Sequence, residues 1–114
     1  MKPPQRGELY WATLDPAIGS EIAKTRPALI ISNNVGNQYA DRVIVAPISS
    51  SGQGKSYPFE VHLNPGEAGL AKESKILLDQ IRTLDKSRLG EQIGTISAER
   101  MEEVNRAIRI SLAV

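Results

Sequence analysis

The segment from Gly19 to Pro27 concentrates side chains that could act on a phosphate. It holds one carboxylate, Glu21, together with hydroxyls and two cations. The proline that follows Arg26 biases this arginine toward an extended backbone, so that its planar fork projects in one direction. That geometry suits a bidentate contact to a phosphate. An arginine that caps a strand end in solvent has the same local signature, so the segment alone leaves both interpretations open.

A second group of polar side chains ends the segment from Ala46 to Ser51, where Ser49, Ser50 and Ser51 follow one another. A serine nucleophile needs an adjacent base, and no lysine or histidine here has a pairing motif. This disfavours a serine hydrolase. A hydroxyl that donates a hydrogen bond to a phosphate oxygen fits better, although an ordinary serine-rich turn explains the local pattern most simply.

The third candidate segment runs from Asp79 to Leu89 and alternates acidic and basic residues. Charge patterns of this kind usually form a salt-bridged surface connector. Asp79 and Gln80 differ from the rest because they directly follow an apolar strand that can hold them rigidly. The single histidine, His62, lies on the polar face of an expected strand, where a bystander role is more common than a catalytic one.

Short strands must position these groups. Apolar runs and alternation predict six strands, at Glu8–Leu14, Arg26–Ser32, Arg42–Ser49, Tyr57–Leu63, Lys75–Asp79 and Gly90–Ile96. Pro47 inside the third strand predicts a sheet edge or a bulge. We expect Asn33–Asn37 to be a loop, and Leu84–Leu89 to be a charged connector with one helical turn.

One amphipathic helix is expected after Ser97, which is a good N-cap. Met101, Val104, Ile108 and Leu112 recur at helical spacing and should face the core. Ala107, Ile110 and Val114 lie off that face, which suits either an interface or a buried chain terminus. Five to seven strands followed by one helix predict a mainly β (α+β) domain over residues 1–114, a small twisted barrel with the helix packed across it.

Composition narrows the function classes. The chain has 114 residues, no cysteine and one histidine, which excludes disulfides, thiolate metal sites and histidine-rich metal sites. Carboxylates could still hold magnesium. No apolar run approaches the roughly 20 residues that span a bilayer, and no signal peptide is visible, so we expect a cytoplasmic protein. A net charge of +1 argues against coating duplex DNA but allows a local basic site for a short single strand.

Taken together, the segments resemble the MazF/PemK toxin family of bacterial toxin–antitoxin systems. Each matching block alone is weak, but all of them occur in the order and spacing of the family and span nearly the whole chain. The blocks are Arg6–Trp11, Leu14–Pro16 with Gly19–Glu21, Thr25–Asn33, Val43–Ser50, Tyr57–Val61 and Asp79–Leu89.

The resemblance implies an SH3-like barrel of 5–7 strands with a C-terminal helix, the MazF/CcdB-like toxin fold, assembled as a two-fold homodimer. It implies an endoribonuclease that needs neither cofactor nor metal and cuts single-stranded RNA, chiefly mRNA, at a short sequence. It further implies a cognate antitoxin, MazE/PemI-like, whose C-terminal tail occupies the RNA groove. Contact with DNA would be only indirect, through that antitoxin, and no membrane partner is expected.

For the site, the resemblance implies that the ribose 2′-OH attacks the adjacent phosphate, giving a 2′,3′-cyclic phosphate and a free 5′-OH. Arg26 matches the active-site arginine, Ser49 falls where many members carry threonine, and Glu21 could accept a proton or contact RNA. We expect these three to be catalytic. The residues expected to bind RNA are Ser20, Lys24, Ser50, Asp79, Gln80 and Arg82.

Two positions depart from the family pattern. One branch pairs the aspartate corresponding to Asp79 with an arginine two residues earlier, where this chain has Leu77, so its acid–base scheme is in doubt. Ile22 replaces a usual glutamine. A gyrase-poisoning family shares the barrel, so a non-catalytic poison or an inactive partner of the antitoxin are the alternatives. Asn33, Asn37 and Gln80 are candidate readers of base edges.

Overall fold

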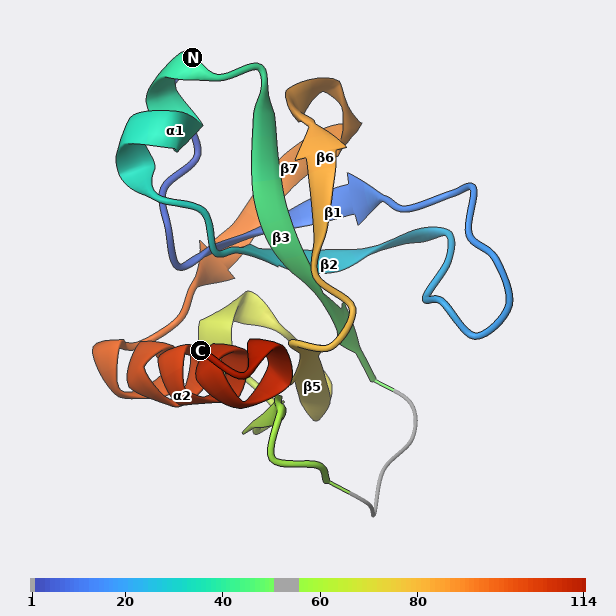
Figure 1. Ribbon diagram of the computed structural model, residues 1–114, viewed down its shortest axis with the longest axis vertical. Helices are drawn as coiled ribbons and strands as arrows, with labels where there is room; N and C mark the ends of the chain where they lie inside the picture. The colour runs from blue at the N-terminus through green and yellow to red at the C-terminus, as the bar shows by residue number, and fades with distance from the viewer. Residues whose placement is uncertain (1, 51–55) are drawn as a thin grey trace.

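The computed structural model describes residues 2–50 and 56–114, and Ser51 lies outside them. Strands are the commonest regular structure in the described chain, which ends in one long helix (Figure 1). The strands are β1 (Glu8–Thr13), β2 (Thr25–Ile30), β3 (Arg42–Ser49), β4 (Glu60–Leu63), β5 (Ser74–Leu77), β6 (Arg82–Asp85) and β7 (Leu89–Thr95). The helices are α1 (Asn34–Tyr39) and α2 (Ala98–Leu112), with single 3-10 turns η1 (Glu67–Gly69) and η2 (Lys86–Arg88).

All strand pairs are antiparallel, and the seven strands form one sheet in the order β4-β5-β3-β2-β1-β7, with β6 also paired to β3. This confirms a mainly β protein with a C-terminal helix. Among the residues described, no ladder joins the two end strands β4 and β7. Closure of the sheet into a barrel therefore stays a prediction.

Strand β3 lies at the centre of the sheet and changes partner along its length. Its first half, Arg42 to Val45, pairs with β6, and its end, Ile48 and Ser49, pairs with β5. Pro47 pairs with Ala28 of β2 on one side, but neither the β6 ladder nor the β5 ladder includes it on the other, so the expected edge is present locally within a central strand. The Ile44 carbonyl accepts from Ile31 on the β2 side, and backbone groups alternate along a strand. The nitrogen of Pro47 thus faces the gap between the β6 and β5 ladders. No strand there would accept a hydrogen bond, so the missing N–H of proline costs nothing.

The sheet carries an apolar cluster on each face. The larger one packs under α2, and its fully buried members include Leu9, Leu29, Ile48, Leu63, Ile76, Leu78 and Val104. The smaller one lies on the opposite side of β1, β2 and β3, and it is built from Ala12, Leu14, Ala28, Ile30, Val43, Val45 and Leu84. Two packed faces fix the strand register, because a slip by one residue would exchange the two sets of side chains.

Two expectations for connecting segments need correction. Asn33–Asn37 is not a loop: Asn33 caps α1, and its side chain accepts from the Gly36 amide at 2.7 Å. A six-residue helix has too few turns to show a clear hydrophobic period, which is why the pattern did not reveal it. The helical turn expected within Leu84–Leu89 is present as η2, but Arg82–Asp85 before it forms strand β6.

Helix α2 begins where expected. The Ser97 side chain accepts from the Arg100 amide at 3.2 Å, which confirms the N-cap. Val104 and Ala107 are its buried residues, so Ala107 belongs to the core face. Leu112, in contrast, is half exposed, and Ile110 and Val114 at the same end of the chain are exposed too. None of the helices described is long and apolar enough to cross a membrane.

Candidate active site

The loop between β1 and β2, residues 14–24, arches away from the sheet (Figure 1) and is closed at its base. The Leu14 amide donates to the Lys24 carbonyl at 2.8 Å, and the Lys24 amide donates to Oδ1 of Asp15 at 2.8 Å. Lys24 adopts a left-handed backbone, with φ of 68°. A non-glycine residue keeps that conformation only where its surroundings enforce it, so the base of the loop is tightly defined.

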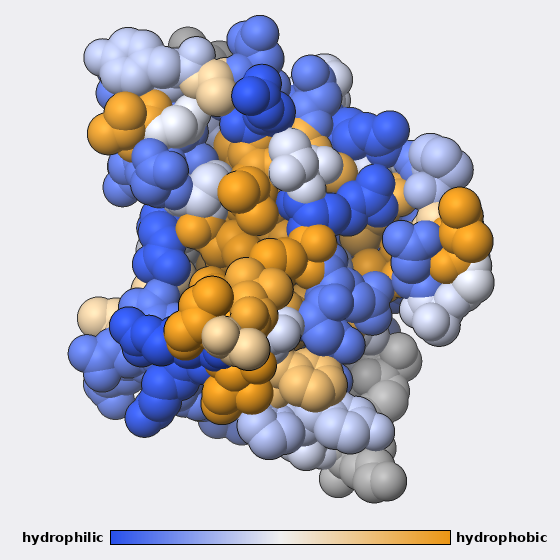
Figure 2. Space-filling model, viewed as in Figure 1, coloured by the Kyte–Doolittle hydropathy of each residue, from blue (hydrophilic) through white to orange (hydrophobic). Residues whose placement is uncertain are grey.

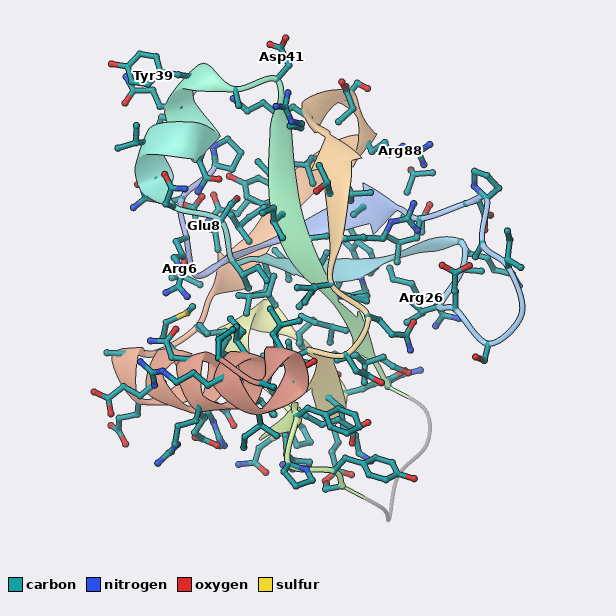
Figure 3. All side chains as sticks on the ribbon, in the orientation of Figure 1. Arg6, Glu8, Arg26, Tyr39, Asp41 and Arg88 are labelled. Carbon is teal, nitrogen blue, oxygen red and sulfur yellow. The ribbon has the colours of Figure 1, made fainter. Side chains whose placement is uncertain are left out.

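Residues that follow β5 tie this loop to the rest of the sheet. Oε1 of Gln80 accepts from the Ile22 amide at 2.8 Å, and a terminal nitrogen of Arg82 donates to the Leu14 carbonyl at 2.8 Å. Arg88 donates to the carbonyls of Thr13 and Asp15 at 3.2 and 2.6 Å. Figure 3 shows Arg88 and Arg26 on opposite sides of the loop base. Gln80 and Arg82 therefore hold the loop in place, independently of any contact they make with a ligand.

Arg26 lies next to the last hydroxyl of β3. The ladder between β2 and β3 ends at the pair Ala28 and Pro47, two residues from Arg26 on one strand and two residues from Ser49 on the other. The same register, continued to these two residues, predicts that their side chains share a face, with Cβ atoms roughly 5 Å apart. Both side chains are half buried, and Nε of Arg26 donates to the Ala23 carbonyl at 3.2 Å. That bond leaves the terminal nitrogens of the guanidinium to meet a ligand beside the Ser49 hydroxyl.

Glu21, Asp79, Gln80 and Arg82 come together around a second feature, a hollow of about 440 Å³ between the loop and the segment after β5. Glu21 is exposed, and its Oε1 accepts from the Ile18 amide at 2.6 Å, so one carboxylate oxygen is used within the loop. Ile22 also lines this hollow and packs against the smaller apolar cluster. An apolar residue at position 22 thus anchors the loop, which a glutamine could not do in the same way.

Other expected residues fall in different places. Ser20 is exposed on the loop, and Ser50 lines a separate cavity of about 380 Å³ together with Arg26. Leu77 is buried in β5 opposite Glu60 of β4. Asn37 is fully buried, with its side-chain nitrogen donating to the Ser32 carbonyl, so its expected contact with a base edge is wrong. The side-chain oxygen of Asn33 already accepts the hydrogen bond that caps α1.

His62 is paired with a carboxylate. Its Nε2 lies 2.6 Å from Oε2 of Glu73, and both side chains are partly exposed on the β4–β5 hairpin. His62 lines neither the cavity beside Arg26 nor the hollow beside Glu21. Within residues 2–50 and 56–114, no group of three or more His, Asp or Glu side chains is arranged to hold a metal ion.

Sequence reasoning missed three residues near the site. Arg88 holds the loop base, whereas the alternating charges around it indicated only a salt-bridged surface connector. Trp11 and Lys72 line the cavity that contains Arg26 and Ser50. The signal for Trp11 was available: it is the only tryptophan, and it alternates with the buried Ala12 on a strand. Lys72 follows a turn and carries no such pattern.

Comparison with known proteins gives concordant matches. The family described as PemK-like, MazF-like toxin of type II toxin-antitoxin system matches residues 5–112. Endoribonuclease EndoA of Bacillus subtilis is 41% identical over 110 residues, which cover 96% of this chain and 95% of that relative. Endoribonuclease MazF of Staphylococcus saprophyticus is 46% identical over 110 residues, covering 96% of this chain and 92% of that relative.

Solved structures share the fold. The crystal structure of MazF from Deinococcus radiodurans superposes with a TM-score of 0.84 at 32% identity and full coverage of both chains. An endoribonuclease in complex with its cognate antitoxin, from a mycobacterial species, gives a TM-score of 0.80 at 26% identity, covering 97% of this chain and 96% of that one. The strand order and the terminal helix described above are therefore those of the MazF fold.

Proposed function

Because this chain belongs to the PemK-like, MazF-like family of type II toxins and is an endoribonuclease, we propose that it cuts single-stranded mRNA at a short sequence without a metal ion. Single-stranded RNA carries its own nucleophile. The 2′-oxygen attacks the adjacent phosphorus, the bond from phosphorus to the 5′-oxygen breaks, and one proton moves from the 2′-OH while another reaches the leaving oxygen. The products are a 2′,3′-cyclic phosphate and a 5′-OH end.

The observation that supports this proposal is that Arg26 and Ser49 each lie two residues beyond the last pair of the β2–β3 ladder, at neighbouring strand ends. The reaction builds negative charge on the non-bridging oxygens of the phosphorane. A guanidinium held by the Ala23 carbonyl can meet that charge with its terminal nitrogens, and the Ser49 hydroxyl can donate a further hydrogen bond from the next strand. Donors fixed on strands need little reorganisation when the charge forms.

Glu21 and Asp79 are the carboxylates proposed to take part in proton movement or RNA positioning. They lie around the same hollow, beside Arg82. Leu77 supports assigning Asp79 to positioning, because a buried leucine two residues earlier supplies no acid–base partner. We propose Glu21 as the proton acceptor, since its second carboxylate oxygen is not the one bonded to Ile18.

The same loop and strand ends are proposed to bind the flanking RNA, through Ser20, Lys24, Ser50, Asp79, Gln80 and Arg82. Lys24 and Arg82 would contact phosphates. Arg82 uses one terminal nitrogen on Leu14, which leaves further guanidinium donors. Gln80 uses its oxygen on Ile22, so its amide nitrogen would be the group that meets a base edge.

One exposed apolar surface supports a proposal for assembly. Figure 2 shows apolar side chains gathered around the end of α2, where Ile110, Leu112 and Val114 are half or more exposed. We propose that this surface lies in a two-fold homodimer. We further propose a cognate antitoxin partner of the MazE/PemI type, contact with DNA only through that antitoxin, and action in the cytoplasm, where mRNA is found.

The test is cleavage of a long natural mRNA by purified protein in EDTA, with both fragment ends mapped. We expect cuts at one short motif with cyclic phosphate and 5′-OH ends. Arg26→Ala should lose roughly 100- to 1000-fold in rate while keeping its thermal stability, as expected for a preorganised donor. Cleavage that stops in EDTA, or near-normal cleavage by a folded Arg26→Ala variant, would refute the mechanism.

A further inference from the structure

Most of the residues that line the cavity beside Arg26 have no role in the proposed cleavage chemistry. Its volume is about 380 Å³, within the size range of small-ligand sites. Buried Ile48 and Leu70 contribute an apolar base, and the indole of Trp11, with 44% of the residue exposed, forms one side. Hydroxyls of Thr25 and Ser50 also line it. An apolar slot with an exposed indole and hydrogen-bonding groups suits a flat heteroaromatic ring.

The charged side chains that line the cavity are both positive. Arg26 and Lys72 are the ionisable residues among the described residues that line it, and no carboxylate joins them. A nucleobase is always linked to phosphates, so a slot flanked by two cations matches a nucleotide better than an uncharged ring. An apolar peptide side chain would fill the slot but leave both cations without a counter-ion.

The wall that carries Lys72 is held close to the sheet. A Cβ added at Gly69 would lie 2.4 Å from the carbonyl oxygen of Ile93, and one at Gly94 would lie 2.3 Å from that of Ala68. Just before this wall, Glu67 accepts from Arg100 of α2 at 2.7 Å. The slot is therefore preformed, which lowers the cost of ordering a ligand.

We propose that this cavity binds the nucleobase next to the scissile phosphate, stacked on Trp11, with Lys72 contacting the phosphate beyond it. The inference rests on the proposed function and adds a specificity site to it. Single-stranded RNA is generally read by stacking bases on aromatic rings and by hydrogen bonds to their edges. Arg26 contributes to the cavity wall, so a base bound there would lie near the residue proposed to meet the scissile phosphate.

The chain provides its own reporter, because Trp11 is its only tryptophan. The probe is an RNA oligonucleotide that contains the mapped cleavage motif, with 2′-deoxyribose at the cut so that it binds without reacting. We expect saturable quenching of the Trp11 fluorescence. An abasic site at one nucleotide flanking the cut should abolish the quenching and weaken binding about 5- to 150-fold, whereas one placed outside the motif should change neither.

Variants separate stacking from charge, with affinity measured by anisotropy of labelled RNA. Trp11→Ala should weaken binding about 5- to 150-fold, and Trp11→Phe should recover most of it because a ring is retained. Lys72→Gln should lower the slope of log affinity against log salt by about one. Lys86→Gln, which removes a cation outside this cavity, is the matched control and should leave the slope unchanged. Thermal melting verifies that each variant is folded.

The outcomes distinguish this inference from the proposed function. If wild-type protein cleaves RNA and Arg26→Ala does not, but no abasic position removes the quenching, the base-binding assignment is wrong while the cleavage mechanism stands. The same conclusion follows if Trp11→Ala binds RNA as tightly as wild type. Quenching by the purified antitoxin and by no RNA would assign the cavity to a protein segment and overturn the proposal.

Discussion

The side-chain oxygen of Gln80 accepts a hydrogen bond from the backbone amide of Ile22 across 2.8 Å, and this bond joins the β1–β2 loop to the segment after β5. The loop carries Glu21 and Lys24, and it leads into Arg26. A residue expected to read RNA thus also positions the residues expected to cut it.

Replacing Gln80 with alanine should loosen the loop without unfolding the protein. The lost hydrogen bond is worth about 1 kcal/mol, so exchange of the Ile22 amide with deuterium should accelerate roughly fivefold. Gln80→Glu retains an acceptor oxygen and should keep the protection. Unchanged exchange at Ile22 in the alanine variant would show that the loop is held by its other contacts.

Removing the Ser49 hydroxyl should slow the chemical step. A hydrogen bond to a charged group contributes about 1.5–3 kcal/mol, so Ser49→Ala should lower the single-turnover cleavage rate roughly 10- to 150-fold. Ser49→Thr keeps the hydroxyl and should retain most of the activity. Equal rates for the alanine and threonine variants would remove Ser49 from the proposed catalytic set.

Acid should weaken the contact between α2 and η1. The Arg100 side chain donates to Glu67, which together with the Asn64 amide lowers the pKa of Glu67 from 4.5 to about 2. A lowered pKa stabilises the folded state above the unfolded value, and this contribution is lost as the pH falls from about 4.5 toward 2. Both side chains are partly exposed, so solvent screening limits the effect to about 1 kcal/mol.

Urea denaturation between pH 7 and pH 2 measures this contribution. Arg100→Met should be less stable than wild type at pH 7, and the difference should vanish near pH 2. Glu91→Gln, which removes an exposed carboxylate on β7, serves as the control and should keep the wild-type pH dependence. If Arg100→Met lowered the free energy of unfolding by the same amount at every pH, the stabilisation could not come from the ionised Glu67 side chain.

A methyl group at Gly94 should destabilise the fold. Its Cβ would lie 2.3 Å from the Ala68 carbonyl oxygen, so backbone must move, at a cost of about 1–3 kcal/mol. The melting temperature should fall by roughly 4 °C or more. Gly36→Ala is the matched control: the new Cβ would only touch the Asn33 side chain at 3.4 Å, and alanine favours a helix, so no loss is expected.

Strand periodicity and the N-cap rule were sufficient to predict most of the fold. Val61 and Leu63 alternate with Glu60 and His62, and the structure buries the first pair in β4. Ser97 caps α2 as predicted. The short β6 could not be predicted, since Arg82–Asp85 is charged and gains its strand conformation from pairing with β3, a contact between distant parts of the chain.

The candidate site was predictable in its residue types but not in its arrangement. The proline after Arg26 and the hydroxyls after Pro47 are local signals, and both segments lie where strands end. That the strand ends with Arg26 and Ser49 are neighbours depends on the β2–β3 register, and that Gln80 and Arg82 hold the loop depends on tertiary contacts. Neither follows from spacing along the sequence.

The hydrogen bonds that hold the β1–β2 loop also affect when during synthesis the protein can become active. The side chains that hold the loop come 58 to 73 residues after the loop positions they bind. A chain still emerging from the ribosome lacks them until the segment through Arg88 has left the exit tunnel. These hydrogen bonds to the loop therefore cannot form during most of synthesis. We expect the nascent protein to be unable to cut the mRNA from which it is being translated.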